Sequence, residues 1–144
     1  MIFNSLTAEV FVADQISIED IGVAAERGIR TIICNRPDGE TPDQPETELL
    51  RRAAAEAGIE FVHIPIVSGR FDEQSIEAFQ SVLLSGQKPV LAYCRSGMRS
   101  SCLWALASVD SMELNGIVSA AKDAGYDLSP LVPALEARKM RSNR

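Results

Sequence analysis

Residues 89–107 read PVLAYCRSGMRSSCLWALA, and this stretch decides the fold. Its first five residues, 89–93, are apolar enough to form a central strand that is covered on both faces. An apolar helix is predicted directly after the loop, and Gly97 supplies the tight turn between strand and helix. A buried strand that leads through a short loop into a helix is the basic unit of an α/β sheet.

The rest of the chain repeats this alternation. Strands are predicted over 9–13, 30–34 and 60–64, and helices over about 18–28, 45–57, 73–85, 112–124 and 130–139. Successive strand–helix–strand units favour parallel pairing with right-handed crossovers. The predicted fold class is therefore α/β, with a central, mostly parallel sheet of four or five strands and helices on both faces. A length of 144 residues predicts one domain over 1–144, and the basic end at 138–144 predicts a disordered tail.

Composition narrows the possible partners. The chain has 14 Lys and Arg against 20 Asp and Glu, a net charge of −6, which disfavours nucleic acid as a partner. No apolar run is long enough to span a membrane, and the first residues show no secretory signal. Three cysteines without a C-x-x-C pair predict neither a disulfide framework nor a metal site. The expected location is the reducing cytoplasm.

The loop after the central strand carries the predicted chemistry. Cys94 ends that strand, and Arg99 lies five residues later at the start of the helix. A tight turn of this kind aims successive N–H groups into one concavity, and the positive end of the helix adds to their attraction for an anion. The same surroundings lower a thiol pKa from about 8.5 into the range of about 3.5–7.5. We therefore expect Cys94 to be an accessible thiolate nucleophile. The expected anion-binding residues are Arg95, Ser96, Gly97, Met98, Arg99 and Ser100.

Other loops should meet Cys94, because ligands of such sheets bind beyond the carboxyl ends of the strands. Cys34, loop 35–44 and loop 65–72 are all predicted at that edge. Within the second loop, Asp72 is interpreted as the N-cap of the helix over 73–85 and as a candidate general acid. Asp38 in Pro-Asp-Gly is interpreted as a turn residue and as a second candidate acid.

Four further side chains receive two interpretations each. Arg36 and Arg70 are predicted to be solvated loop charges, and the alternative is that they line the pocket at this edge. His63, the only histidine, is expected to be a half-buried, hydrogen-bonded residue rather than a base. Cys34 is either a small buried residue or a redox partner that forms a disulfide with an oxidised Cys94.

Three segments carry a family resemblance: NRPDGE at 35–40, HIP at 63–65 and YCRSGMRS at 93–100. Together they resemble the bacterial beta-lactamase-hydrolase-like phosphatase domain, over roughly residues 1–130. The resemblance implies a fold like that of the dual-specificity phosphatases and a cysteine-dependent hydrolase. It implies Cys94 as nucleophile and Arg99 as oxyanion ligand, with a small phosphoester as substrate.

The active loop departs from the phosphatase pattern and is similar to that of rhodanese sulfurtransferases. Only four residues separate Cys94 from Arg99, Ser100 stands where phosphatases have arginine, and Tyr93 stands where they have histidine. The general acid of phosphatases has no counterpart soon after Pro65. A rhodanese-like sulfurtransferase or persulfide carrier, with a sulfane-sulfur donor as substrate, is therefore the second hypothesis. A non-catalytic module that binds phosphate or sulfate is the third. Neither enzymatic chemistry requires a metal or an organic cofactor.

Overall fold

The computed structural model describes residues 3–142. One sheet has the strand order β1-β2-β5-β3-β4. Its members are β1 (Asn4–Ser5), β2 (Val10–Ala13), β3 (Thr31–Cys34), β4 (Glu60–His63) and β5 (Val90–Tyr93). All pairings are parallel except that of β1 with β2. The predicted fold class is confirmed, and β1 is a strand that the sequence pattern did not predict.

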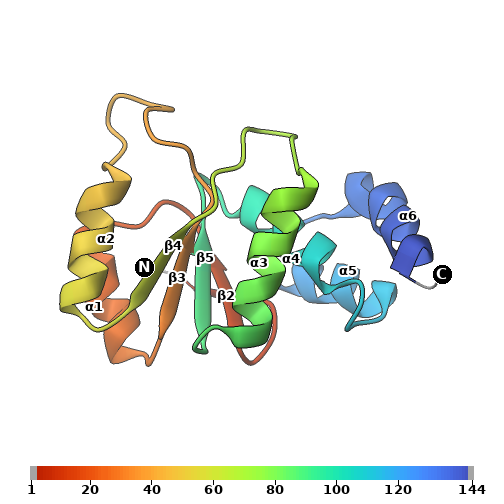
Figure 1. The fold of residues 1–144 in the computed structure, drawn as a ribbon, viewed down its shortest axis with the longest axis horizontal. Helices are drawn as coiled ribbons and strands as arrows, with labels where there is room; N and C mark the ends of the chain where they lie inside the picture. The colour runs from red at the N-terminus through yellow and green to blue at the C-terminus, as the bar shows by residue number, and fades with distance from the viewer. Residues whose placement is uncertain (1–2, 143–144) are drawn as a thin grey trace.

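Helices cover both faces of this sheet (Figure 1). On one face lie α1 (Ile18–Glu26) and α2 (Thr47–Glu56). On the other lie α3 (Glu73–Ser85), α4 (Met98–Ser108), α5 (Leu114–Asp123) and α6 (Val132–Ser142), with a short 3₁₀ turn, η1 (Ser129–Leu131), before α6. This is the arrangement that right-handed crossovers produce around a parallel sheet.

The period of two in the strands divides the core into two parts. In β3, Ile33 packs toward α3 and α4, whereas Ile32 and Cys34 pack toward α1 and α2. In β5, Ala92 belongs to the first cluster and Tyr93 to the second. Because alternate strand residues point to opposite faces, residues that are adjacent in sequence here serve different layers.

Helix α4 is buried along almost its whole length. Every residue from Ser100 to Ser108 is buried, since the helix packs against α3, α5 and α6 as well as the sheet. A helix that is enclosed on all sides needs no polar face, which explains the apolar run CLWALA. The loop that precedes α4 is therefore mounted on the most enclosed helix of the described chain.

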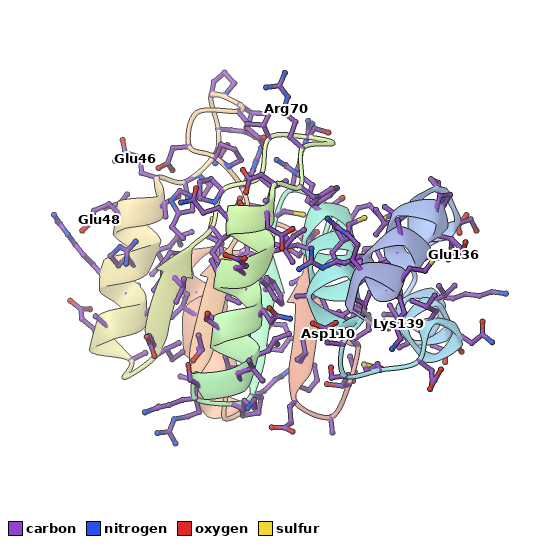
Figure 2. The ribbon with its side chains drawn as sticks, turned by 45° about the vertical axis from the view of Figure 1, so that its right-hand side comes forward. Glu46, Glu48, Arg70, Asp110, Glu136 and Lys139 are labelled. Atoms are coloured by element: carbon purple, nitrogen blue, oxygen red, sulfur yellow. The ribbon has the colours of Figure 1, made fainter. Side chains whose placement is uncertain are left out.

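The prediction of a disordered tail over 138–144 is wrong for 138–142, which continue α6, and residues 143–144 lie outside the described part. Two basic side chains attach this end to the rest of the fold. Arg138 pairs with Glu73 of α3, with 2.7 Å between Nη1 and Oε2. Lys139 donates from Nζ to the carbonyl oxygen of Val109 at 2.6 Å, close to Asp110 in Figure 2. These contacts stabilise a segment whose composition alone is typical of a solvated tail.

Across residues 3–142, no helix is both long and apolar enough to cross a membrane. The same residues contain no group of three or more His, Cys, Asp or Glu side chains with the spacing of a metal site.

Candidate active site

The connections that follow β3, β4 and β5 meet at one edge of the sheet, as predicted, above the strand ends in Figure 1. Arg99 donates from Nη1 to the carbonyl oxygen of Ile66 at 2.8 Å. Ser100 donates from Oγ to Oδ1 of Asn35 at 2.8 Å, and Asn35 donates from Nδ2 to the carbonyl of Ile64. The loop after β5 is thus fixed to the loops that follow β3 and β4.

The 94–100 loop curls around the sulfur of Cys94. Gly97 has a φ of +94°, a left-handed conformation that favours glycine, and its N–H donates to Sγ of Cys94 at 3.1 Å. The backbone N–H groups of Arg95, Ser96, Arg99 and Ser100 have no acceptor among residues 3–142. Free N–H groups at a helix start next to a sulfur form the concavity that binds an oxyanion.

Tyr126, from the segment after α5, supports this loop from outside. Its hydroxyl donates to the carbonyl of Ser96 at 3.2 Å and accepts from Nδ2 of Asn4 at 3.2 Å. A Cβ atom on Gly97 would lie 2.2 Å from that hydroxyl oxygen. Position 97 therefore requires glycine for two reasons, conformation and space.

The expected accessibility of Cys94 is wrong for this conformation, because the residue is 0% exposed. The strand end, the 94–100 loop and the start of α4 enclose it. Its surroundings nonetheless include the Arg99 guanidinium. The hydrogen bonds that Arg99 donates to Glu40 are the main cause that raises the pKa of Arg99, and its electrostatic interaction with Cys94 adds to it. Access of a substrate to this sulfur requires the surrounding loops to move.

The other predicted anion-binding residues divide into two groups. Arg95 and Ser96 are exposed at the rim. Met98 is partly buried and packs against the core. Ser100 is fully buried with its hydroxyl committed to Asn35, so this hydroxyl holds the loop in place and is not directed to an anion.

Arg36 is not a solvated charge, since only 4% of its side chain is exposed. It donates from Nε to Oε1 of Glu40 at 2.9 Å. Glu40 in turn accepts two hydrogen bonds from Arg99, at 2.6 Å from Nη1 and 2.8 Å from Nη2. Sequence reasoning missed Glu40; the only available signal was the spacing of Arg36 and Glu40, four residues apart within the NRPDGE segment. Arg70 matches its prediction and is exposed, with its side chain directed outward (Figure 2).

Cys34 and Cys94 occupy different surroundings, because Cys34 ends β3 whereas Cys94 lies in the loop after β5. Cys34 belongs to the cluster against α1 and α2, donates from Sγ to the carbonyl of Arg36 at 3.3 Å, and is buried. His63 lies beside it at the end of β4, with Nε2 3.1 Å from the same carbonyl oxygen. The hydrogen bond with Cys34 is the main cause that raises the pKa of His63. Both thiols are free and buried, and a disulfide between these two cysteines stays a prediction.

Both candidate acids cap helices. Asp38 lies in a turn, as predicted, and accepts from the N–H of Thr47 at 2.9 Å and its hydroxyl at 2.6 Å. Asp72 is the predicted N-cap of α3 and accepts from the N–H of Ser75 at 2.7 Å. Hydrogen bonds lower the pKa of both carboxyl groups, from Thr47 for Asp38 and from Ser75 for Asp72. Carboxylates held ionised in this way are poor proton donors at neutral pH.

The family resemblance implies phosphoester turnover, and we expect Asp72→Asn to retain both stability and any turnover of an aryl phosphate, because asparagine caps a helix about as well as aspartate. Asp72→Ala should lose about 1 kcal/mol of unfolding free energy, again with turnover preserved. Urea unfolding and a turnover assay check both variants. A loss of turnover of about a hundredfold or more in Asp72→Asn, at unchanged stability, would instead identify Asp72 as a proton donor.

The fold and the cysteine loop define a class, that of proteins built like the tyrosine and dual-specificity phosphatases. Tk-PTP in its active form has a TM-score of 0.71 to this chain at 16% identity, over 96% of this chain and 97% of that one. Kinase associated phosphatase, solved with its catalytic-site cysteine replaced by serine, has a TM-score of 0.72 at 16% identity, over 93% and 87%. Likenesses at this level of identity describe the fold.

A model of the family described as "Beta-lactamase hydrolase-like protein, phosphatase-like domain" matches residues 2–111, and the chain belongs to this family, as predicted. The Beta-lactamase hydrolase-like protein of Xylella fastidiosa (strain 9a5c) is 34% identical over 122 residues, which are 83% of this chain. That match covers only 28% of the relative's length. The "putative phosphatase" of Neisseria meningitidis Z2491 is 32% identical with a TM-score of 0.82, over 93% of this chain and 96% of that one.

Proposed function

We propose that this chain hydrolyses phosphate monoesters with Cys94 as the nucleophile. The observation that carries the proposal is the N–H of Gly97 directed at Sγ of Cys94, 3.1 Å away, with the Arg99 guanidinium beside it. A sulfur at the centre of such a loop has the surroundings that stabilise a thiolate and bind the oxygens of a phosphoryl group. The family of the chain and the name of its Neisseria relative support the same reaction class.

In the proposed reaction, the thiolate of Cys94 attacks phosphorus, a P–S bond forms and the P–O ester bond breaks. The leaving oxygen takes a proton from water. A water molecule then attacks the phosphocysteine, the P–S bond breaks, and inorganic phosphate leaves with the thiolate restored. Arg99 and the free N–H groups of the 94–100 loop bind the non-bridging oxygens throughout.

The choice of test substrate follows from the two capping carboxylates. With Asp38 and Asp72 held ionised by their helix caps, the leaving group must depart without protonation by either. Aryl phosphates meet this condition because a phenolate is a far more stable anion than an alkoxide. We therefore use an aryl phosphate in the experiment below.

Rapid acid quench of the protein with an aryl phosphate, followed by intact mass measurement, tests the proposal. We expect a gain of one phosphoryl group, located on Cys94 by peptide mapping. The adduct should be absent from Cys94→Ala and present in Cys102→Ala. Cys102 is a suitable control because its thiol is buried in the core, and burial raises its pKa to about 11. Turnover without any cysteine adduct would contradict the proposal.

Thiosulfate in the same measurement tests the second candidate function. The spacing of four residues between Cys94 and Arg99 is the observation that favours a sulfurtransferase, and a gain of one sulfur atom on Cys94 would support it. The comparisons with known proteins give that candidate no support. If neither the phosphoryl adduct nor the sulfur adduct forms, the result would favour a module that binds anions without turnover.

A further inference from the structure

The strongest unexplained feature of the site is an ionic cluster formed by Arg36, Glu40 and Arg99. Arg36 is 4% exposed, and the exposed fractions of the Glu40 and Arg99 side chains are 26% and 13%. One carboxylate between two guanidiniums neutralises part of the positive charge that an anion would otherwise meet. A carboxylate at this place weakens the attraction of the site for a phosphate, and a structural role of Glu40 would offset that cost.

This role follows from the donors of Arg99. A guanidinium has five N–H groups. Two of them bond Glu40 through Nη1 and Nη2, and the second N–H of Nη1 bonds the carbonyl of Ile66. The two that are left, on Nε and Nη2, lie parallel on one edge. Two parallel N–H groups match two oxygens of a phosphate, the geometry for which arginine is suited and lysine is not.

We propose that Glu40 is a positioning residue, which grips the end of the Arg99 guanidinium so that its side edge faces Cys94 and binds the substrate oxyanion. This inference rests on the proposed function and extends it to the loop between β3 and α2. Cys94 lies near this guanidinium, since the two side chains interact electrostatically, and the free N–H groups of the 94–100 loop surround the same sulfur.

The contacts of Glu40 exclude the alternative that its carboxylate imitates a bound substrate. A substrate mimic would accept hydrogen bonds from the N–H groups of the 94–100 loop. Among the described residues, the donors to the Glu40 carboxylate are only the Arg36 and Arg99 guanidiniums, and no backbone N–H of the 94–100 loop donates to it. The carboxylate therefore bonds the Nη1–Nη2 end of Arg99 and does not occupy the N–H groups of the loop.

Glu40 is itself held by a second layer of contacts. Arg36 donates from Nη1 to Oε1 of Gln15 at 3.0 Å and from Nη2 to the hydroxyl of Thr41 at 3.1 Å. The backbone N–H of Gln15 donates to the carbonyl of Arg95 at 3.3 Å, so the cluster returns to the active loop. Hydrogen bonds from Arg99 lower the pKa of Glu40 from 4.5 to about 2. The stabilising contribution of the Glu40–Arg99 ion pair is therefore fully present above pH 4.5 and is lost as the pH falls through about 2.

Calorimetric titration with tungstate, a tetrahedral dianion, tests this role without turnover. We expect Glu40→Gln to bind tungstate about ten- to thirtyfold more weakly, because Arg99 must then be ordered on binding. Glu40→Asp, with the charge retained one methylene further back, should recover part of the affinity. Glu46→Gln is the matched control, since it removes the same charge from an exposed position at the start of α2 (Figure 2) and should leave affinity unchanged.

Unchanged or tighter tungstate binding by Glu40→Gln would overturn the positioning role, because removal of a negative charge alone favours an anion. An equal loss in Glu46→Gln would overturn it as well. Aryl phosphate turnover of the wild-type protein separates the two proposals. Tungstate binding that needs Glu40, without wild-type turnover, keeps the positioning role and refutes the hydrolase. Turnover with no effect of Glu40→Gln on tungstate keeps the hydrolase and refutes the positioning role.

Discussion

Cys94→Ser should abolish aryl phosphate turnover, with a loss of about 10⁴-fold or more. A serine hydroxyl at this position is almost wholly protonated at neutral pH, and the described structure offers it no base. The only histidine, His63, lies at the end of β4 with its ring against the carbonyl of Arg36 and beside Cys34. Removal of the nucleophile should therefore leave no covalent route.

The measurement needs one control and one check of folding. Cys102→Ala removes a thiol from the core below the same loop and should keep turnover within a few-fold of the wild type. Tungstate binding by Cys94→Ser should survive, since the N–H groups and Arg99 are unchanged. Undiminished turnover in Cys94→Ser would show that the chemistry occurs elsewhere.

Gly97→Ala has the second largest expected effect. Residue 97 adopts a φ of +94°, which costs an L-residue about 1–2 kcal/mol, and its new Cβ would lie 2.2 Å from the Tyr126 hydroxyl oxygen. Overpacking adds about 1–3 kcal/mol, so we expect a loss of about 2–5 kcal/mol in unfolding free energy. Turnover should fall to background because the N–H of residue 97 no longer reaches Cys94.

Gly116→Ala is the matched control. Gly116 lies in α5 with open space around its Cα and no positive φ, so the change should be neutral or stabilise by about 1 kcal/mol. Combining Gly97→Ala with Tyr126→Ala should relieve the clash and leave the backbone strain. Wild-type stability and turnover in Gly97→Ala alone would mean that the loop is far more adaptable than its contacts indicate. Urea unfolding and turnover assays measure all of these variants.

Local signals were strongest where the chain is most buried. Four strands lie within one residue of their predicted limits, at 10–13, 31–34, 60–63 and 90–93. A short apolar run bounded by Gly, Pro or a helix signal is too short for a helix, so a buried strand is the structure that it favours. β1 escaped prediction since two residues, Asn4 and Ser5, carry no periodicity. Only its pairing with β2 makes it a strand.

The sequence predicts those parts of the candidate site that lie within a few residues of Cys94 in the chain. The order of Cys94, Gly97 and Arg99 within one turn indicates an anion loop from chemistry alone. The burial of Arg36 and the contact of Glu40 with Arg99 depend on how loops 59 residues apart meet, and composition says only that such charges are polar. The helix at 138–142 also depends on a contact between distant residues, because Arg138 pairs with Glu73 of α3.

The enclosure of α4 has a consequence for how the family match is used. The match ends at residue 111, yet Ile117, Ala121, Leu128 and Leu135 beyond it are all fully buried in the cluster that surrounds α4. A fragment that ends at that boundary would expose the side of α4 that these residues cover, and it would lack Tyr126, whose hydroxyl bonds to Ser96 of the 94–100 loop. The segment that the family model matches is therefore shorter than the segment that forms the core around α4.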